Sequence, residues 1–151
     1  MKEKINQLRK INHPQHAILA VAMIGIGLIL VCNDYYFFWP PFAIGFLNDD
    51  LTGGIFIAVG VWLFSWAISN KNKIATNRNL LVITAALLAF ESVSEFVHGS
   101  ISGQPHMIMA GFLELIVLMF DFLLISKRQE MNEIKRFIII QNQKLKQNTE
   151  H

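Results

Sequence analysis

Two acids and a histidine form the clearest chemical pattern in this sequence. Glu91, Glu95 and His98 are spaced i, i+4 and i+7, so on a helix they fall within about 60° of one face. Their neighbours are mainly apolar residues such as Leu, Phe, Val and Ala. An ionisable side chain inside a membrane span is costly and is by default a candidate functional group.

A second apolar run carries acids of its own. Glu114 and Asp121 share a face at spacing i, i+7, and His106 stands just before that run. With a rise of 1.5 Å per residue, Glu91 lies about 10 Å below His98, and Glu114 lies about 12 Å below His106. Because the two runs are joined by a short polar turn, they form an antiparallel pair, and Glu91 and Glu114 are expected at one depth.

Nothing basic in these runs neutralises the acids, since residues 80–98 and 107–125 contain no Lys or Arg. Carboxylates that meet in a low dielectric must share a proton or hold a cation. We therefore predict a proton- or ion-binding site made of Glu91, Glu95, Glu114 and Asp121. Carboxylates and imidazoles also suit a divalent metal ion such as Zn, Mn or Fe, and the candidate metal ligands are His98, His106, Glu95, Asp49 and Asp34.

Two other interpretations of the acids remain open. In one, the acids form hydrogen bonds with Ser92, Ser94 and each other, and only fix the helix register. In the other, the site is catalytic and acts on a lipid or isoprenoid, with Glu95 or Glu91 as acid–base and a histidine as partner or metal ligand. The sequence contains no nucleophile elbow, phosphate loop or HExxH motif, which favours a non-enzymatic protein.

The elements that position these residues are apolar helices. A helix needs roughly 20 apolar residues to cross a bilayer, and the chain is 53% hydrophobic and only 16% charged. This predicts an all-α, four-transmembrane-helix bundle with spans at about 17–38, 51–68, 80–98 and 107–125. A basic N-terminus at 1–16 precedes the membrane domain at 17–126, and an amphipathic tail follows at 127–151.

The first span is expected to be an uncleaved helix, because no small-x-small cleavage site follows it. Asn33 and Asp34 are predicted in its last turns. The aromatic stretch 35–42, broken by Pro40 and Pro41, is typical of a membrane interface.

The second span begins at a polar helix start, residues 48–52. Gly53, Gly60 and Ala67 recur every seven residues along it, and such a stripe lets a neighbouring helix approach closely.

Topology follows from the basic residues, which gather before the first span, in the loop 69–79 and after residue 126. The other two loops contain no Lys or Arg, so the positive-inside rule predicts a multi-pass protein of the cell membrane with both termini cytoplasmic.

A net charge of +2 is too small to indicate nucleic-acid binding, and the single Cys32 excludes an intramolecular disulfide.

The tail carries apolar residues at helical spacing, including Met131, Ile134, Ile138 and Leu145. It is predicted to lie on the membrane surface or to pair with a second copy of the chain.

The resulting functional hypothesis is a small integral membrane protein with an acidic and histidine-containing pocket, open toward the outer face, that binds or conducts a proton or metal cation. No other cofactor is predicted. Beyond the lipid bilayer, a homo-dimer or larger membrane complex is expected, since one four-helix bundle is small for a pathway. The alternatives are a non-enzymatic accessory or immunity protein and, less favoured, a lipid-modifying membrane enzyme.

Overall fold

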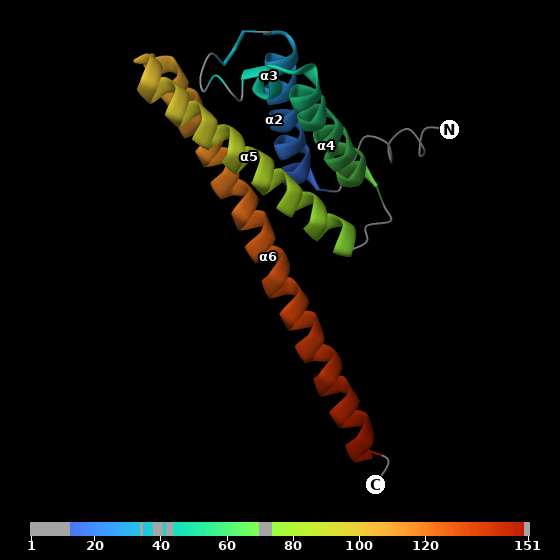
Figure 1. The fold of residues 1–151 in the computed structure, drawn as a ribbon. Helices are drawn as coiled ribbons and strands as arrows, with labels where there is room; N and C mark the ends of the chain where they lie inside the picture. The colour runs from blue at the N-terminus through green and yellow to red at the C-terminus, as the bar shows by residue number, and fades with distance from the viewer. Residues whose placement is uncertain (1–12, 34, 38–40, 42–43, 70–73, 150–151) are drawn as a thin grey trace, which may run out of the picture.

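A computed structural model describes residues 13–33, 35–37, 41, 44–69 and 74–149. The secondary structure in these residues is entirely helical (Figure 1). Four segments are long and apolar enough to cross a membrane, as expected for a multi-pass membrane protein. The helices are α2 (Pro14–Val31), α3 (Ile44–Leu47), α4 (Asp50–Ile68), α5 (Ile74–Ser102) and α6 (Pro105–Thr149).

The bundle is built from two helical hairpins, because α2 packs along α4 and α5 packs along α6, with fewer contacts between the pairs. Glycine residues on α4 allow its backbone to lie close to that of α2. A Cβ added to Gly53 would lie 2.7 Å from the Gly27 oxygen, and one added to Gly60 would lie 3.0 Å from the Ala20 oxygen. The predicted small-residue stripe therefore does bring the backbones of two helices together.

The turn between α5 and α6 is shorter than the predicted 98–106 loop. Gly103 has φ +66° and the Gln104 N–H donates to the Gly99 oxygen at 3.2 Å, which together form a Schellman-type helix end. Pro105 then opens α6. The helix continues through His98, and the buried Gly99 that follows it packs against α6: a Cβ on Gly99 would lie 2.7 Å from Ile108 Cγ1.

The first span is also shorter than the predicted 17–38. α2 ends at Val31, and the Asn33 side chain donates to the Ile29 oxygen at 2.7 Å. An Asn side chain that binds a last-turn carbonyl competes with helix continuation. Asn33 thus follows the helix instead of lying in its last turn, and Asp34 is outside the described residues.

The fourth span and the tail form one helix. α6 is 45 residues long, or about 67 Å at the standard rise, and in Figure 1 it runs far past the other helices. α6 includes the predicted amphipathic tail up to Thr149, and no break separates the tail from the span because helix-forming residues continue through Lys127 without Gly or Pro.

Several ionisable side chains are buried inside this bundle, and many large apolar side chains are exposed on its surface. Glu91, Glu95 and Asp121 are at most 1% exposed, whereas Ile18 and Met109 are 63% and 64% exposed. A water-soluble protein has the opposite arrangement, since its charged residues are almost never fully buried. The outward apolar faces therefore suit contact with lipid.

Candidate cation site

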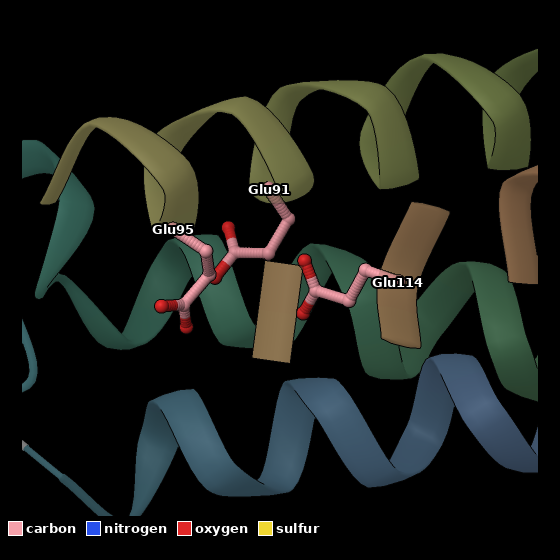
Figure 2. Close-up of side chains that lie close together, drawn as sticks. All are labelled: Glu91, Glu95 and Glu114. Carbon is pink, nitrogen blue, oxygen red and sulfur yellow. The ribbon is translucent and has the colours of Figure 1, made fainter. Parts of the chain in front are cut away.

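Three carboxyl groups from two helices converge in the bundle. Glu91 and Glu95 of α5 and Glu114 of α6 each offer an oxygen, and these oxygens all lie within 4.8 Å of one another. Figure 2 shows Glu91 and Glu95 extending from α5 and Glu114 reaching toward them from α6. Oxygens at this spacing surround a volume in which one small cation contacts several of them.

The helix contact next to the acids determines their spacing. The Ser92 hydroxyl donates to the Gly111 carbonyl oxygen at 2.9 Å, and a Cβ on Gly111 would lie 3.2 Å from the Glu95 Cβ. α6 therefore approaches α5 closely at Gly111. Glu114 follows within the next turn of the helix, so it reaches Glu91 and Glu95.

The acids are buried without a full set of hydrogen bonds. Glu91 and Glu95 are each 1% exposed, and within the described part of the chain the Oε2 atoms of Glu91, Glu95 and Glu114 have no hydrogen-bond partner. Ser92 and Ser94 donate instead to the backbone oxygens of Gly111 and Phe90. The two serine hydroxyls therefore donate to the backbone and not to the acids, whereas hydrogen bonds among the acids themselves stay a prediction.

One carboxyl oxygen has a donor from the loop after α2. The Tyr36 hydroxyl donates to Glu95 Oε1, which joins residues 59 positions apart. Burial, and next the hydrogen bond to Glu95, raise the pKa of the Tyr36 hydroxyl, which lies outside the spanning helices. The phenol therefore keeps its proton and acts as a donor at neutral pH.

The loop that carries Tyr36 is held at the following residue. The Phe37 N–H donates to Asn48 Oδ1 at 2.8 Å, and Asn48 Nδ2 donates back to the Phe37 oxygen at 2.6 Å. The Phe37 ring is buried edge-on against the His98 ring, with centroids 5.4 Å apart. These contacts fix the backbone beside Tyr36 and so direct its side chain at Glu95.

A cavity of about 190 Å³ adjoins the three acids. Its other walls come from the loop, from α2 and from α6, and are mostly apolar. It is lined by Tyr36, Glu91, Glu95, Glu114, Ala110, Leu113, Ile26, Ile29 and Leu30.

The other predicted ligands lie elsewhere. His98 is buried against Phe37 and is not one of the converging groups. His106 is exposed and interacts electrostatically with Glu95. Asp49 caps α4 by accepting from the Leu51 N–H at 2.8 Å, and Asp34 is outside the described residues.

Asp121 is also separate from the three glutamates. It is 0% exposed, and within the described residues neither of its carboxyl oxygens has a hydrogen-bond partner. Seven residues along a helix correspond to about 10 Å, so sharing a face with Glu114 does not place Asp121 in the same cluster.

Sequence reasoning missed Tyr36 and Asn48. Tyr36 belongs to an aromatic stretch that is typical of membrane interfaces, and Asn48 precedes a helix start. A polar aromatic next to an apolar span was the available signal, but the pairing with Glu95 depends on the fold of the loop.

No protein-family model matches this chain, and neither the curated proteins nor the solved structures contain a significant match. The functional assignment therefore depends on the residues and contacts described above.

Proposed function

We propose that this chain is a small multi-pass membrane protein, with both termini in the cytoplasm, that binds a cation at Glu91, Glu95 and Glu114. The observation that carries the proposal is the convergence of two buried carboxyl groups, Glu91 and Glu95, and the half-buried Glu114, with oxygens within 4.8 Å of one another, in a bundle with an apolar exterior. Negative charges so close together in a low dielectric need compensation by protons or by a metal ion.

The donor set indicates the class of metal. All three converging groups are carboxylates, and the Tyr36 hydroxyl is hydrogen-bonded to one of them. Oxygen-only sites suit hard divalent cations such as Mg²⁺, Ca²⁺ and Mn²⁺, whereas Zn²⁺ sites usually include nitrogen or sulfur. A shared proton is the alternative occupant of the same site.

Equilibrium binding of Mn²⁺ to the purified protein tests this proposal. Mn²⁺ titrated into the protein in nanodiscs is followed by the loss of its free EPR signal. Glu91→Gln, Glu95→Gln and Glu114→Gln should each weaken binding at least about tenfold, since each removes a charged ligand. Glu130→Gln is the control, because Glu130 is exposed on α6.

Two results decide between the occupants. Saturable Mn²⁺ binding that the three substitutions weaken supports a metal site. Absent Mn²⁺ binding, together with proton flux in liposomes that Glu91→Gln and Glu114→Gln abolish, would assign a proton instead. If neither Mn²⁺ binding nor proton flux depends on the three glutamates, the proposed function is wrong.

A second candidate role is supported by the long α6. Beyond the bundle it carries exposed apolar side chains at Met131, Ile134, Phe137 and Ile138. Such a face suits pairing with a second copy of the chain, in keeping with the expected homo-dimer. Truncation after Gln129 should then convert a dimer to a monomer in light scattering; an unchanged mass would exclude α6 as the dimer contact.

A further inference from the structure

A second, more polar cavity lies beside the site at the end of the bundle that carries the α5–α6 turn. It measures about 520 Å³. Its walls come from the loop after α2 and from the start of α6, and it is lined by Cys32, Asn33, Tyr35, Tyr36, Gln104, His106 and Met107. Several of these side chains, including Tyr35 at 92% exposure, are open to the surroundings.

Tyr36 is the residue that this cavity shares with the cavity next to the glutamates. Its hydroxyl is bound to Glu95 Oε1, so the phenol side chain lies where the two spaces meet. His106, in the wall of the larger cavity, interacts electrostatically with the same Glu95. A chain of polar groups thus leads from the turn end of the bundle to the three carboxyl groups.

We propose that the cavity beside Cys32 and His106 is the vestibule through which a hard divalent cation reaches Glu91, Glu95 and Glu114, and that Tyr36 is the gate between the two. This proposal rests on the proposed cation binding. The gate is closed when the Tyr36 hydroxyl is bound to Glu95. It opens by rotation of the Tyr36 side chain, because the clamp of Phe37 by Asn48 holds the neighbouring backbone in place.

The arrangement also explains why Tyr36 is a positioning residue and not a principal ligand. Its neutral hydroxyl donates a hydrogen bond to Glu95 and contributes no charge to the site. Breaking this hydrogen bond exposes a Glu95 oxygen to an entering cation. Loss of the hydroxyl should therefore change the rates of entry and release together, and the affinity much less.

The test measures equilibrium and kinetics separately in full-length protein in nanodiscs. The equilibrium measurement is Mn²⁺ titration by EPR, and the kinetic ones are Mn²⁺ binding and its release into excess EDTA after rapid mixing. Tyr36→Phe should speed both binding and release about tenfold, as expected for the loss of one hydrogen bond to a charged group. Its dissociation constant should stay within about threefold of the wild-type value.

The native thiol provides a second, independent measurement. Cys32 is exposed and lies in the wall of the vestibule. A bulky maleimide on Cys32 should slow both binding and release of Mn²⁺ without changing the dissociation constant. Cys32→Ser treated with the same reagent is the control, and its rates should equal those of the untreated protein.

The outcomes separate this proposal from the one on which it rests. If the glutamate substitutions leave Mn²⁺ binding unchanged, the cation site itself is wrong. If Mn²⁺ binds normally but neither Tyr36→Phe nor the Cys32 label changes a rate, the vestibule is wrong. In that case we expect the cation to enter from the side of the bundle, through the cavity wall that contains Ala110. Ala110→Trp should then slow Mn²⁺ entry. A Tyr36→Phe effect confined to release and affinity would make Tyr36 a ligand and overturn the gate.

Discussion

The Ser92 hydroxyl donates to the Gly111 carbonyl oxygen at 2.9 Å, and this contact fixes the register of α5 against α6. Glu91 and Glu95 flank Ser92 on one helix, and Glu114 lies three residues after Gly111 on the other. The register that this pair sets is therefore also the register that brings the three carboxyl groups together. Sliding one helix along the other by one turn would move Glu114 by about 5.4 Å and disperse the cluster.

Gly111→Val should disrupt both the packing and the cation site. A Cβ at Gly111 already lies 3.2 Å from the Glu95 Cβ and from the Ser92 oxygen, and the γ-methyl groups of Val have no space without separating the helices. Overpacking of this kind costs about 1–3 kcal/mol of unfolding free energy. Thermal unfolding in detergent and Mn²⁺ titration measure the two effects.

Gly54→Val is the matched control, because nothing lies within 4 Å of a Cβ at Gly54. It introduces the same β-branched residue into a helix and should leave Mn²⁺ binding unchanged. Equal losses in the two variants would show that helix propensity, and not the α5–α6 contact, accounts for the effect of Gly111→Val.

Glu91→Gln should stabilise the metal-free protein while it weakens Mn²⁺ binding. Glu91 is 1% exposed beside two further acids, so a neutral amide of similar shape relieves both desolvation and repulsion. The gain is on the order of 1–3 kcal/mol in the free energy of unfolding at neutral pH. Chemical denaturation without metal, then with saturating Mn²⁺, measures it.

The sign of the change in unfolding free energy distinguishes a cation-binding role of Glu91 from a purely structural one. Were Glu91 only a structural group, its replacement would remove hydrogen bonds and lower stability, and Mn²⁺ would protect neither protein. A cation site predicts the opposite sign in the absence of metal, and greater protection of the wild type than of Glu91→Gln at the same Mn²⁺ concentration.

Asp121→Asn should leave Mn²⁺ affinity unchanged. Asp121 is fully buried but is not one of the three converging carboxyl groups. Its neutral analogue removes a buried charge and should therefore preserve or raise stability. Titration and thermal unfolding of the same preparation test both points, and a tenfold loss of affinity would return Asp121 to the site.

Asn48→Ala should loosen the loop that carries Tyr36. The substitution removes two hydrogen bonds to the backbone of Phe37, each worth about 1 kcal/mol net. We expect a loss of about 2 kcal/mol in unfolding stability and faster Mn²⁺ entry. Ser65→Ala, which removes one exposed hydrogen bond to the Val61 oxygen on α4, is the control and should change neither quantity appreciably.

Much of the helical architecture follows from local pattern alone. Runs of about 20 apolar residues must form helices in a membrane, because lipid offers no partners for unsatisfied backbone groups. Two acids at i, i+4, such as Glu91 and Glu95, share a face on any helix. The spacing of Gly53 and Gly60 likewise predicted close helix approach before any partner helix was known.

Helix ends and the partners of the acids were decided by tertiary contacts. α5 continues past His98 because Gly99 packs against Ile108, and Asp49 caps α4 away from the acids. Nothing local in a stretch rich in aromatic residues distinguishes a tyrosine that faces lipid from one that faces Glu95.

The sequence alone determined that carboxyl groups lie in apolar helices and that Glu91 and Glu95 share a helix face, since both follow from composition and helical periodicity. Only the tertiary structure decided that Glu114 joins them, that Asp121 does not and that Tyr36 binds Glu95. Those outcomes depend on the register of α5 against α6 and on the path of the loop after α2. Both are set by contacts between residues far apart in the chain, such as Ser92 with Gly111 and Phe37 with Asn48.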